Sequence, residues 1–322
     1  MKKLEDLTEL LSSELKLIDL PTSPSNLYDP LHYFLTHGGK RIRPILTLLG
    51  AEIFGENVNK AIPASLAVEL FHNFSLIHDD IMDEAPLRRN RETVHQKWNQ
   101  NIAILSGDVL FVKAFQLLAK QENRHLQDLL NLFNKTAIEV CEGQQMDMDF
   151  EAREDVSIPE YIEMIRLKTS VLLGCALELG AIIADASKSD RANIYEFGQN
   201  IGIAFQIQDD ILDLYADPKN FGKQVGGDVI SNKKTLLFLK GVELANENQK
   251  AELVMLSRNK DFLNKVKRTR EIYTLVGART SCEKEMQRYF ELAMNALSKL
   301  SIPEEKKSDL IDLANSLMIR TN

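Results

Sequence analysis

The chain has 322 residues, of which 44% are hydrophobic and 27% charged, and its formal net charge is −8. This composition is typical of a globular protein with ample material for a core, and the acidic balance disfavours a general nucleic-acid or anionic-membrane surface. The scattered cysteines Cys141, Cys175 and Cys282 show no CxxC pair and no Cys/His spacing. They predict reduced thiols in a cytoplasmic protein and no zinc site.

Helical patterning dominates the chain. Apolar residues recur at spacings of three and four, whereas alternating strand-like runs are scarce. The pattern predicts helices over 4–18, 31–54, 61–82, 102–119, 126–148, 159–184, 191–214, 234–244, 250–256 and 268–300. Because the breaks are short and no low-complexity linker divides the chain, we expect one all-α domain over residues 1–322, a bundle with antiparallel neighbouring helices.

No targeting or membrane segment is expected. The N-terminus is amphipathic and carries acidic residues early, so it does not read as a signal peptide. The most apolar stretch, 171–184, is interrupted by Glu178 and is too short for a membrane span, so it predicts a buried core helix.

The first chemically suggestive segment is Gly38-Gly39-Lys40-Arg41-Ile42-Arg43-Pro44, in which three cations follow a glycine pair. Glycines let the backbone approach a ligand closely, and the cations favour an anionic ligand. The segment is not a Walker A loop, because the upstream glycine and the Ser/Thr are missing. It predicts a phosphate contact rather than only a basic helix start.

The helix predicted over 61–82 reaches three aspartates at i, i+1 and i+4, namely Asp79, Asp80 and Asp83. At about 100° per residue, they fall within an arc of about 100° on one helical face. Their apolar neighbours imply a poorly solvated wall, where three like charges are costly unless cations neutralise them. Oxygen-only ligands suit Mg²⁺, which prefers a few carboxylates together with water and substrate phosphates.

Arg88 and Arg89 follow in the loop after Pro86, which stops the helix. Guanidinium groups pair well with phosphate oxygens, so this pair predicts a phosphate contact beside the metal cluster. His78 before Asp79 also resembles part of an HD-type metal phosphohydrolase. That interpretation requires a further upstream His and a distant Asp, and it leaves a second aspartate cluster unexplained.

This second cluster repeats the spacing of the first at Asp209, Asp210 and Asp213, again inside an apolar run. Two such clusters facing each other would make a cage for a polyphosphate. Further cations accompany them, because Lys168-Thr169 precedes the most apolar stretch, and Lys223 and Lys233 lie in and after a glycine-rich loop. Lysines are strong point-charge binders of phosphate.

Together these residues resemble the trans-isoprenyl diphosphate synthase family, which includes farnesyl and geranylgeranyl diphosphate synthases. The family's first aspartate-rich motif, DDxxD with a trailing RR, matches Asp79, Asp80, Asp83, Arg88 and Arg89. Its second motif matches Phe205, Gln206, Asp209, Asp210 and Asp213, its GGKR motif matches Gly38 to Arg41, its KT pair matches Lys168 and Thr169, and its late lysines match Lys223 and Lys233. The resemblance runs from about residue 38 to residue 234 and shows no catalytic departure, which disfavours an inactive member.

The resemblance implies a helical bundle around a deep central cavity, usually in a homodimer, and a prenyltransferase that uses about three Mg²⁺ ions. Both aspartate clusters would hold these ions on the diphosphate of an allylic substrate, with cationic contacts from Arg88, Lys168, Lys223 and Lys233. Isopentenyl diphosphate would be held by Gly39, Lys40, Arg43, His72 and Arg89. Gln144 and Asp147 would line the site near the first cluster.

The implied reaction is ionisation, condensation and elimination. Breaking the allylic C–O bond gives a carbocation and a diphosphate, whose negative charge metals and cations stabilise, while a closed apolar cavity keeps water from the cation. Thr169 and Gln206 would present oxygens to the cation, and the catalytic group comprises Lys168, Thr169, Gln206, Asp79 and Asp209. The departing diphosphate would take the proton, so no side-chain base is expected.

Phe74 and Ser75 lie five and four positions before Asp79, where the floor of the product cavity is expected. A phenyl ring there should block tails of C30 or more, and Ser75 leaves more room than two adjacent aromatics. The motif also lacks the two-residue insertion that bacterial farnesyl synthases often carry. The pattern therefore favours geranylgeranyl diphosphate (C20), with farnesyl diphosphate (C15) as the alternative.

Two other classes stay open. A non-catalytic subunit of another synthase has no need to keep mutually repelling carboxylates, which disfavours it. A terpene cyclase shares the helical fold and one DDxxD, but the second DDxxD and the segment from Gly38 to Arg43 favour condensation. The C-terminal Arg320 is a candidate for closing over the site.

Overall fold

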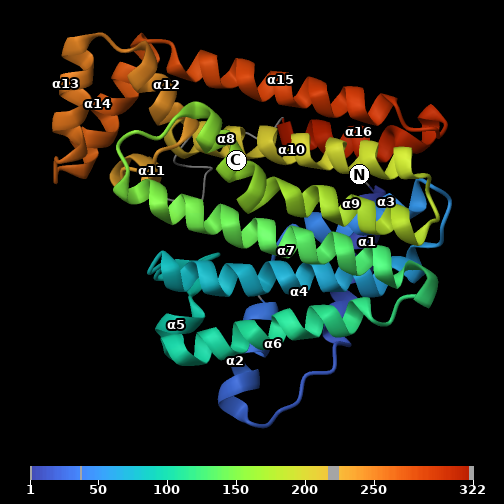
Figure 1. The fold of residues 1–322 in the computed structure, drawn as a ribbon. Coiled ribbons are helices and arrows are strands. Elements are labelled where there is room, and N and C mark those ends of the chain that lie inside the picture. The colour runs from blue at the N-terminus through green and yellow to red at the C-terminus, as the bar shows by residue number, and fades with distance from the viewer. Residues whose placement is uncertain (1, 37, 217–224, 319–322) are drawn as a thin grey trace. The chain divides into compact units, whose positions relative to one another are not determined.

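In the computed structural model, the described residues are 2–36, 38–216 and 225–318. They are helical almost throughout (Figure 1), and their only sheet is a hairpin of β1 (Leu87–Arg88) and β2 (Arg91–Glu92), in which Leu87 pairs with Glu92. The all-α prediction is confirmed.

The chain forms two compact units, each assembled from separate stretches of sequence. Unit 1 comprises residues 1–135, 175–195 and 301–306, and unit 2 comprises residues 136–174, 196–300 and 307–322. Four helices contribute residues to both units: α7 (Asn123–Ala152), α9 (Val171–Ile183), α10 (Lys188–Tyr215) and α16 (Glu304–Met318). The expectation of a single domain stays a prediction.

The helices that lie wholly in unit 1 are α1 (Lys2–Lys16), α2 (Ser25–Leu35), α3 (Ile42–Glu52), α4 (Val58–Met82), α5 (Val94–Lys97) and α6 (Gln100–Leu118). The unit is built around α4, which packs along both α3 and α6. The single helix predicted over 31–54 is wrong, because the chain leaves helical geometry between α2 and α3, where Gly38 and Gly39 lie and Arg41 takes a φ of 49°.

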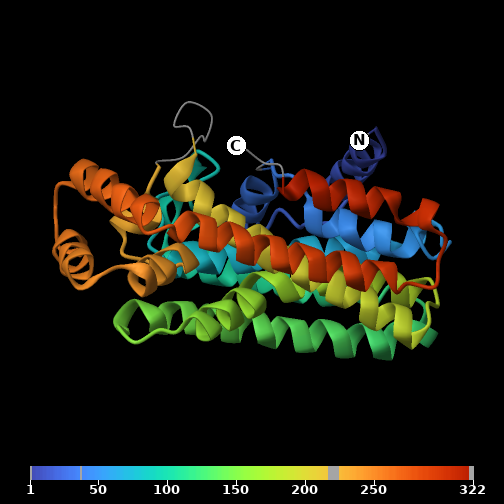
Figure 2. The ribbon, with the colours of Figure 1, turned by 90° about the horizontal axis from the view of Figure 1, so that it is seen from above.

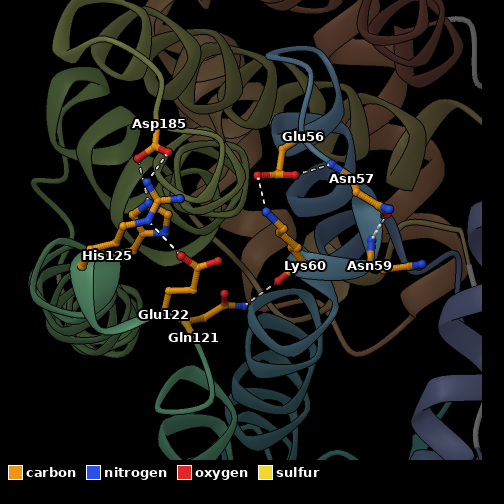
Figure 3. A network of polar contacts seen from close by, with 9 residues as sticks. Glu56, Asn57, Asn59, Lys60, Gln121, Glu122, His125 and Asp185 are labelled. Carbon is orange, nitrogen blue, oxygen red and sulfur yellow. Dashed lines mark hydrogen bonds and ion pairs between the residues drawn. The ribbon is translucent and has the colours of Figure 1, made fainter.

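A polar network in unit 1 joins turns that are distant in sequence (Figure 3). Gln121 Nε2 donates to the carbonyl oxygen of Lys60 at 3.0 Å, and Lys60 Nζ pairs with Glu56 Oε2 at 3.0 Å. The buried ring of His125 lies with Nε2 2.8 Å from Asp185 Oδ1. These contacts fix the start of α4 against the turn before α7, and α7 against the turn after α9.

Unit 2 contains α8 (Ile158–Ile165), the π-helix η1 (Arg166–Ser170), α11 (Gly227–Ile230), α12 (Leu236–Leu244), α13 (Glu247–Ser257), α14 (Phe262–Leu275) and α15 (Ala278–Ser298). Figure 2 gives a second view of these helices. The helix predicted over 268–300 is wrong, because Gly277 at a φ of 78° separates α14 from α15. Helix α16 was not predicted.

One described helix, α6, is long and apolar enough to cross a membrane by length and composition, and 39% of its apolar stretch is buried. Core helices meet the same criterion, since burial and a bilayer both select apolar side chains. The expectation that the chain has no membrane span stays a prediction.

Candidate active site

The first aspartate cluster lies at the C-terminal end of α4. Asp79 and Asp80 occupy its last turn and Asp83 is its C-cap. The carbonyl groups at a helix C-terminus carry partial negative charge, so they add to the field of the carboxylates and favour a cation. Burial raises the pKa of Asp80 to about 6, against the opposing effect of Arg88.

Arg88 lies on these aspartates. Strand β1 carries it, its Nε donates to Asp80 Oδ1 at 2.7 Å, and its Nη2 donates to Asp79 Oδ2 at 3.4 Å. Asp80 is only 1% exposed, and its buried Oδ2 accepts no hydrogen bond from any described residue. A buried carboxylate oxygen left with acceptor capacity beside other carboxylates suits a hard cation.

The residues assigned to isopentenyl diphosphate come together within unit 1. Arg43 Nη1 lies 3.2 Å from His72 Nε2, and because a guanidinium only donates, that ring nitrogen is the acceptor. Burial, with the charge of Arg43, lowers the pKa of His72 well below 6.5, so the ring is neutral. Arg89 donates to the carbonyl oxygen of Gly38, and its guanidinium reaches Gly39. Lys40 is exposed in the same loop.

Arg41 has a different role from its neighbours in the GGKR motif. Its guanidinium turns into the protein, where it pairs with the buried carboxylate of Glu69 and donates to the carbonyl oxygen of Leu35 at 3.2 Å. Glu69 also accepts from Asn73 Nδ2 at 2.8 Å. This buried pair anchors the glycine segment to α4, and sequence reasoning did not assign Glu69 any role.

The second aspartate cluster lies in the last two turns of α10, again at the negative end of a helix. Its central member, Asp210, is 5% exposed and accepts hydrogen bonds from the Tyr161 hydroxyl, from the Leu236 backbone N–H at 3.2 Å and from Gln206 Nε2 at 3.4 Å. Burial, followed by the charge of Asp228, raises the pKa of Asp210 to about 8.

Asp213 organises the segment that follows the cluster. Its Oδ2 accepts from the Asp228 backbone N–H at 3.0 Å, and its carbonyl oxygen accepts from the Gly226 N–H at 2.6 Å. The Lys233 N–H donates in turn to the carbonyl oxygen of Asp228 at 2.9 Å, which places Lys233 in the same folded segment. Two further predicted residues, Lys223 and Arg320, lie outside the described residues.

Lys168 and Thr169 lie in η1, so the helix predicted over 159–184 is interrupted by a π-turn, a feature frequent at functional sites. A methyl group on Gly143 of α7 would collide with the backbone of Lys168, and one on Gly202 of α10 would approach the Ser170 Cα to 2.7 Å. The turn is therefore wedged between two helices that approach it closely.

The side chains on η1 connect to neighbours in unit 2. Lys168 Nζ lies 2.7 Å from Asp147 Oδ2, and Thr169 Oγ1 donates to Gln206 Oε1 at 3.4 Å. Since Gln206 also reaches Asp210, a polar chain links the KT pair to the second cluster. Gln144 is half-buried one helical turn before Asp147 on α7.

Phe74, the proposed floor residue, belongs to an aromatic cluster within unit 1. Its ring stacks on Phe111 of α6, with centroids 4.9 Å apart and planes at 18°, and it meets Phe71 at 5.6 Å. The neighbouring Ser75 hydroxyl donates to the carbonyl oxygen of His72 at 2.9 Å. Stacking holds the Phe74 ring in place, and Phe111 gave no local signal in the sequence.

Lys265 of α14 is a further residue that sequence reasoning missed. It is 2% exposed, and its Nζ donates to the Asn232 Oδ1 at 2.8 Å, the Ile230 carbonyl oxygen at 3.0 Å and the Ser257 carbonyl oxygen at 3.2 Å. It fixes the segment that ends at Lys233. A lone lysine in a basic stretch predicts a solvated side chain, so only packing reveals this role.

Among the described residues, no three His, Cys, Asp or Glu side chains converge as a ready-made ligand set. Mg²⁺ is usually held by one or two carboxylates with water and substrate phosphates rather than by an all-protein cage. Oxygen-only donors at two helix C-termini and the unused Asp80 Oδ2 fit that mode. This combination is typical of a prenyltransferase of the all-α class.

Comparisons with known proteins agree with this class. Residues 24–276 match the polyprenyl synthetase family. A geranylgeranyl diphosphate synthase from Methanosarcina mazei is 46% identical over 229 residues, which cover 69% of this chain and 71% of that protein. A geranylfarnesyl diphosphate synthase from Aeropyrum pernix is 36% identical over 298 residues, covering 90% and 93% of the two chains.

The fold agrees as well. A crystal structure of a geranylgeranyl pyrophosphate synthase superposes with a TM-score of 0.94 at 44% identity, and the match covers 99% of each chain. The chain belongs to the polyprenyl synthetase family, whose members are prenyltransferases. The family assignment made from its motifs is confirmed.

Proposed function

We propose that this protein is a geranylgeranyl diphosphate synthase, which condenses isopentenyl diphosphate with an allylic diphosphate. The observation that carries the proposal is the group formed by Gly39, Arg43, His72 and Arg89, which gathers cations and one neutral imidazole beside an aspartate cluster. A cyclase has no need of such a second diphosphate site. Relatives named geranylgeranyl diphosphate synthase support the choice of product.

The two aspartate clusters would hold about three Mg²⁺ ions, which would supply positive charge to stabilise the departing diphosphate. Asp79, Asp80 and Asp83 at the end of α4, and Asp209, Asp210 and Asp213 at the end of α10, would supply the carboxylate oxygens. The contacts of Asp80 with Arg88 and of Asp210 with Tyr161 hold these two carboxylates in position.

The remaining charged residues bind and orient the substrates. Lys168, Lys223 and Lys233, together with Arg88, contact the allylic diphosphate, while Thr169 and Gln206 direct oxygens toward the developing cation. The hydrogen bond that Thr169 Oγ1 donates to Gln206 Oε1 supports a shared role for that pair. Their oxygens favour positive charge without offering a strong base.

The stacked ring of Phe74 supports a short product. The Phe74 ring stacks on Phe111 with centroids 4.9 Å apart, so rotating it away would cost packing energy. It would therefore block a growing tail beside α4. Ser75 leaves space next to it. We therefore favour the C20 product over C15, and over tails of C30 or more.

We also propose a cytoplasmic homodimer. The exposed side of α6 carries Ile104, Leu105 and Val112, which are 38%, 57% and 58% exposed. An apolar stripe on one helix is suited to pairing with a second copy. Light scattering of the purified protein would test the dimer, and a Leu105→Glu variant should yield monomers.

The deciding experiment incubates the purified chain with Mg²⁺, isopentenyl diphosphate and each allylic primer in turn, followed by chromatography of the products. We expect consumption of isopentenyl diphosphate and a C20 product, whereas mainly C15 would support the alternative. Asp79→Ala and Asp209→Ala should each lose most turnover. Near-normal condensation in either variant, or no activity of the chain alone, would refute the proposal, and the second outcome would favour a regulatory subunit.

A further inference from the structure

The turn between α13 and α14 exposes several large apolar side chains. Met255 and Leu263 are 74% and 87% exposed, and Val254 and Phe262 are 55% and 50% exposed. Figures 1 and 2 show the two helices joined by this short turn. Single exposed apolar residues are common, whereas four around one turn form an apolar surface with no obvious role in folding.

The same turn is basic, although the chain as a whole is acidic. Residues 258–270 contain six lysines and arginines and one acidic residue, against a net charge of −8 for the whole chain. Of the six, Lys265 is buried and Arg268 pairs with Glu252 and Glu271. Arg258, Lys260 and Lys267 are exposed, and none of them forms an ion pair within the described residues. A local cationic surface on an acidic protein directs this end toward an anionic partner.

The turn is held firmly rather than frayed. Asp261 caps α14 by accepting from the Asn264 N–H at 3.2 Å, and Lys265 Nζ donates to the Ser257 carbonyl oxygen at the end of α13 at 3.2 Å. Toward its C-terminal end, α14 packs into the core of unit 2 through the buried side chains of Ile272 and Tyr273. The exposed side chains are therefore presented on a fixed support and do not fill a core.

We propose that this α13–α14 tip, residues 254–263 with Lys267, docks onto the surface of an anionic lipid membrane. Side chains such as Phe262 and Leu263 would enter the boundary between headgroups and acyl chains, and the cations would contact lipid phosphates. Peripheral membrane binding strengthens with the apolar area that is buried and with the electrostatic attraction to anionic lipids, and the tip offers both. The acidic remainder of the chain is repelled by the same surface, so docking fixes one orientation.

Docking goes beyond the proposed function and does not depend on it. If the product is a diphosphate with a long hydrocarbon tail, a docked enzyme would release it next to the bilayer that such a tail favours. Enzymes that transfer the hydrocarbon tail from this diphosphate would then act at the same lipid surface.

The test is flotation of the full chain with vesicles of phosphatidylcholine alone and of phosphatidylcholine mixed with phosphatidylglycerol. We expect binding to the mixed vesicles to exceed binding to the neutral ones by about tenfold or more, and to weaken as salt screens charges beyond a Debye length of about 10 Å at 0.1 M. The double variant Phe262→Ser/Leu263→Ser should lose binding to both kinds of vesicle. Lys260→Glu/Lys267→Glu should lose only the preference for anionic lipid.

Leu17→Ser is the matched control, because Leu17 is also 74% exposed but belongs to unit 1. It should bind vesicles like the unmodified protein. All variants should keep condensation activity in vesicle-free buffer, so a loss of docking is distinguishable from a failure of the proposed function.

Equal binding to neutral and anionic vesicles, no binding to either, or unchanged binding by the Phe262→Ser/Leu263→Ser variant would overturn the proposal. Self-association that this variant abolishes, without vesicle binding by the unmodified protein, would assign the tip to a protein contact and would overturn it as well.

Discussion

Replacing Tyr161 by phenylalanine should weaken the response of the enzyme to Mg²⁺. The Tyr161 hydroxyl donates to Asp210 and thereby lowers the pKa of that carboxyl, which burial has raised to about 8. Without this donor the pKa of Asp210 rises further. Metal binding must then remove a proton from a carboxyl group of higher pKa, which makes binding less favourable.

The size of the effect follows from the hydrogen bond. A bond to a charged group contributes about 1.5–3 kcal/mol, which corresponds to roughly a 10- to 150-fold rise in the Mg²⁺ concentration for half-maximal activity. Since Leu236 and Gln206 still donate to Asp210 at 3.2 and 3.4 Å, we expect the lower part of this range. The rise in the required Mg²⁺ concentration should be smaller at pH 9, where the carboxyl of Asp210 is more easily deprotonated.

The assay is the initial rate of condensation over a Mg²⁺ titration at pH 7 and pH 9, with urea unfolding as a check on stability. Tyr273→Phe is the matched control, because that ring is 3% exposed against 2% for Tyr161, and its hydroxyl forms no hydrogen bond within the described residues. A Tyr161→Phe variant with the normal Mg²⁺ requirement at both pH values would refute the reasoning.

Three further predictions concern other parts of the site. Lys265→Met should raise KM for the allylic diphosphate more than KM for isopentenyl diphosphate, because Lys265 positions the segment that carries the proposed phosphate ligand Lys233. Lys307→Met alters an equally buried lysine and should change the two KM values alike. If Lys265→Met also changes both KM values alike, this role of Lys265 is contradicted. Phe74→Ala and Phe111→Ala should each lengthen the products seen by mass spectrometry, and an unchanged product profile in both would remove the floor argument. In metal-free protein, the pKa of Asp210 is raised, so the native state keeps a proton that the unfolded chain loses above pH 3.8. The free energy of unfolding should therefore fall between about pH 4 and pH 8, by at most about 1.4 kcal/mol per pH unit. Asp210→Asn should reduce this pH dependence in urea titrations.

The sequence alone predicted the parts of the site that depend on local geometry. The spacing of Asp79, Asp80 and Asp83 places them on one helical face because a helix turns by a fixed angle per residue. The order of charged and apolar residues along the chain similarly indicated an all-α protein and its family. The prediction failed where glycine interrupts an apolar pattern, as at Gly277, since periodicity continues across a break that a single left-handed residue creates.

Only the tertiary structure separated residues that look alike in the sequence. Asp210 resembles Asp209 in its local context, but it is buried and receives a hydrogen bond from Tyr161, a residue far from it along the chain. Arg41 sits beside proposed ligands yet pairs with Glu69. Such environments arise from packing between segments that are distant in the sequence. Burial and hydrogen-bond partners determine the pKa values and the roles of these residues, and no periodic sequence pattern predicts them.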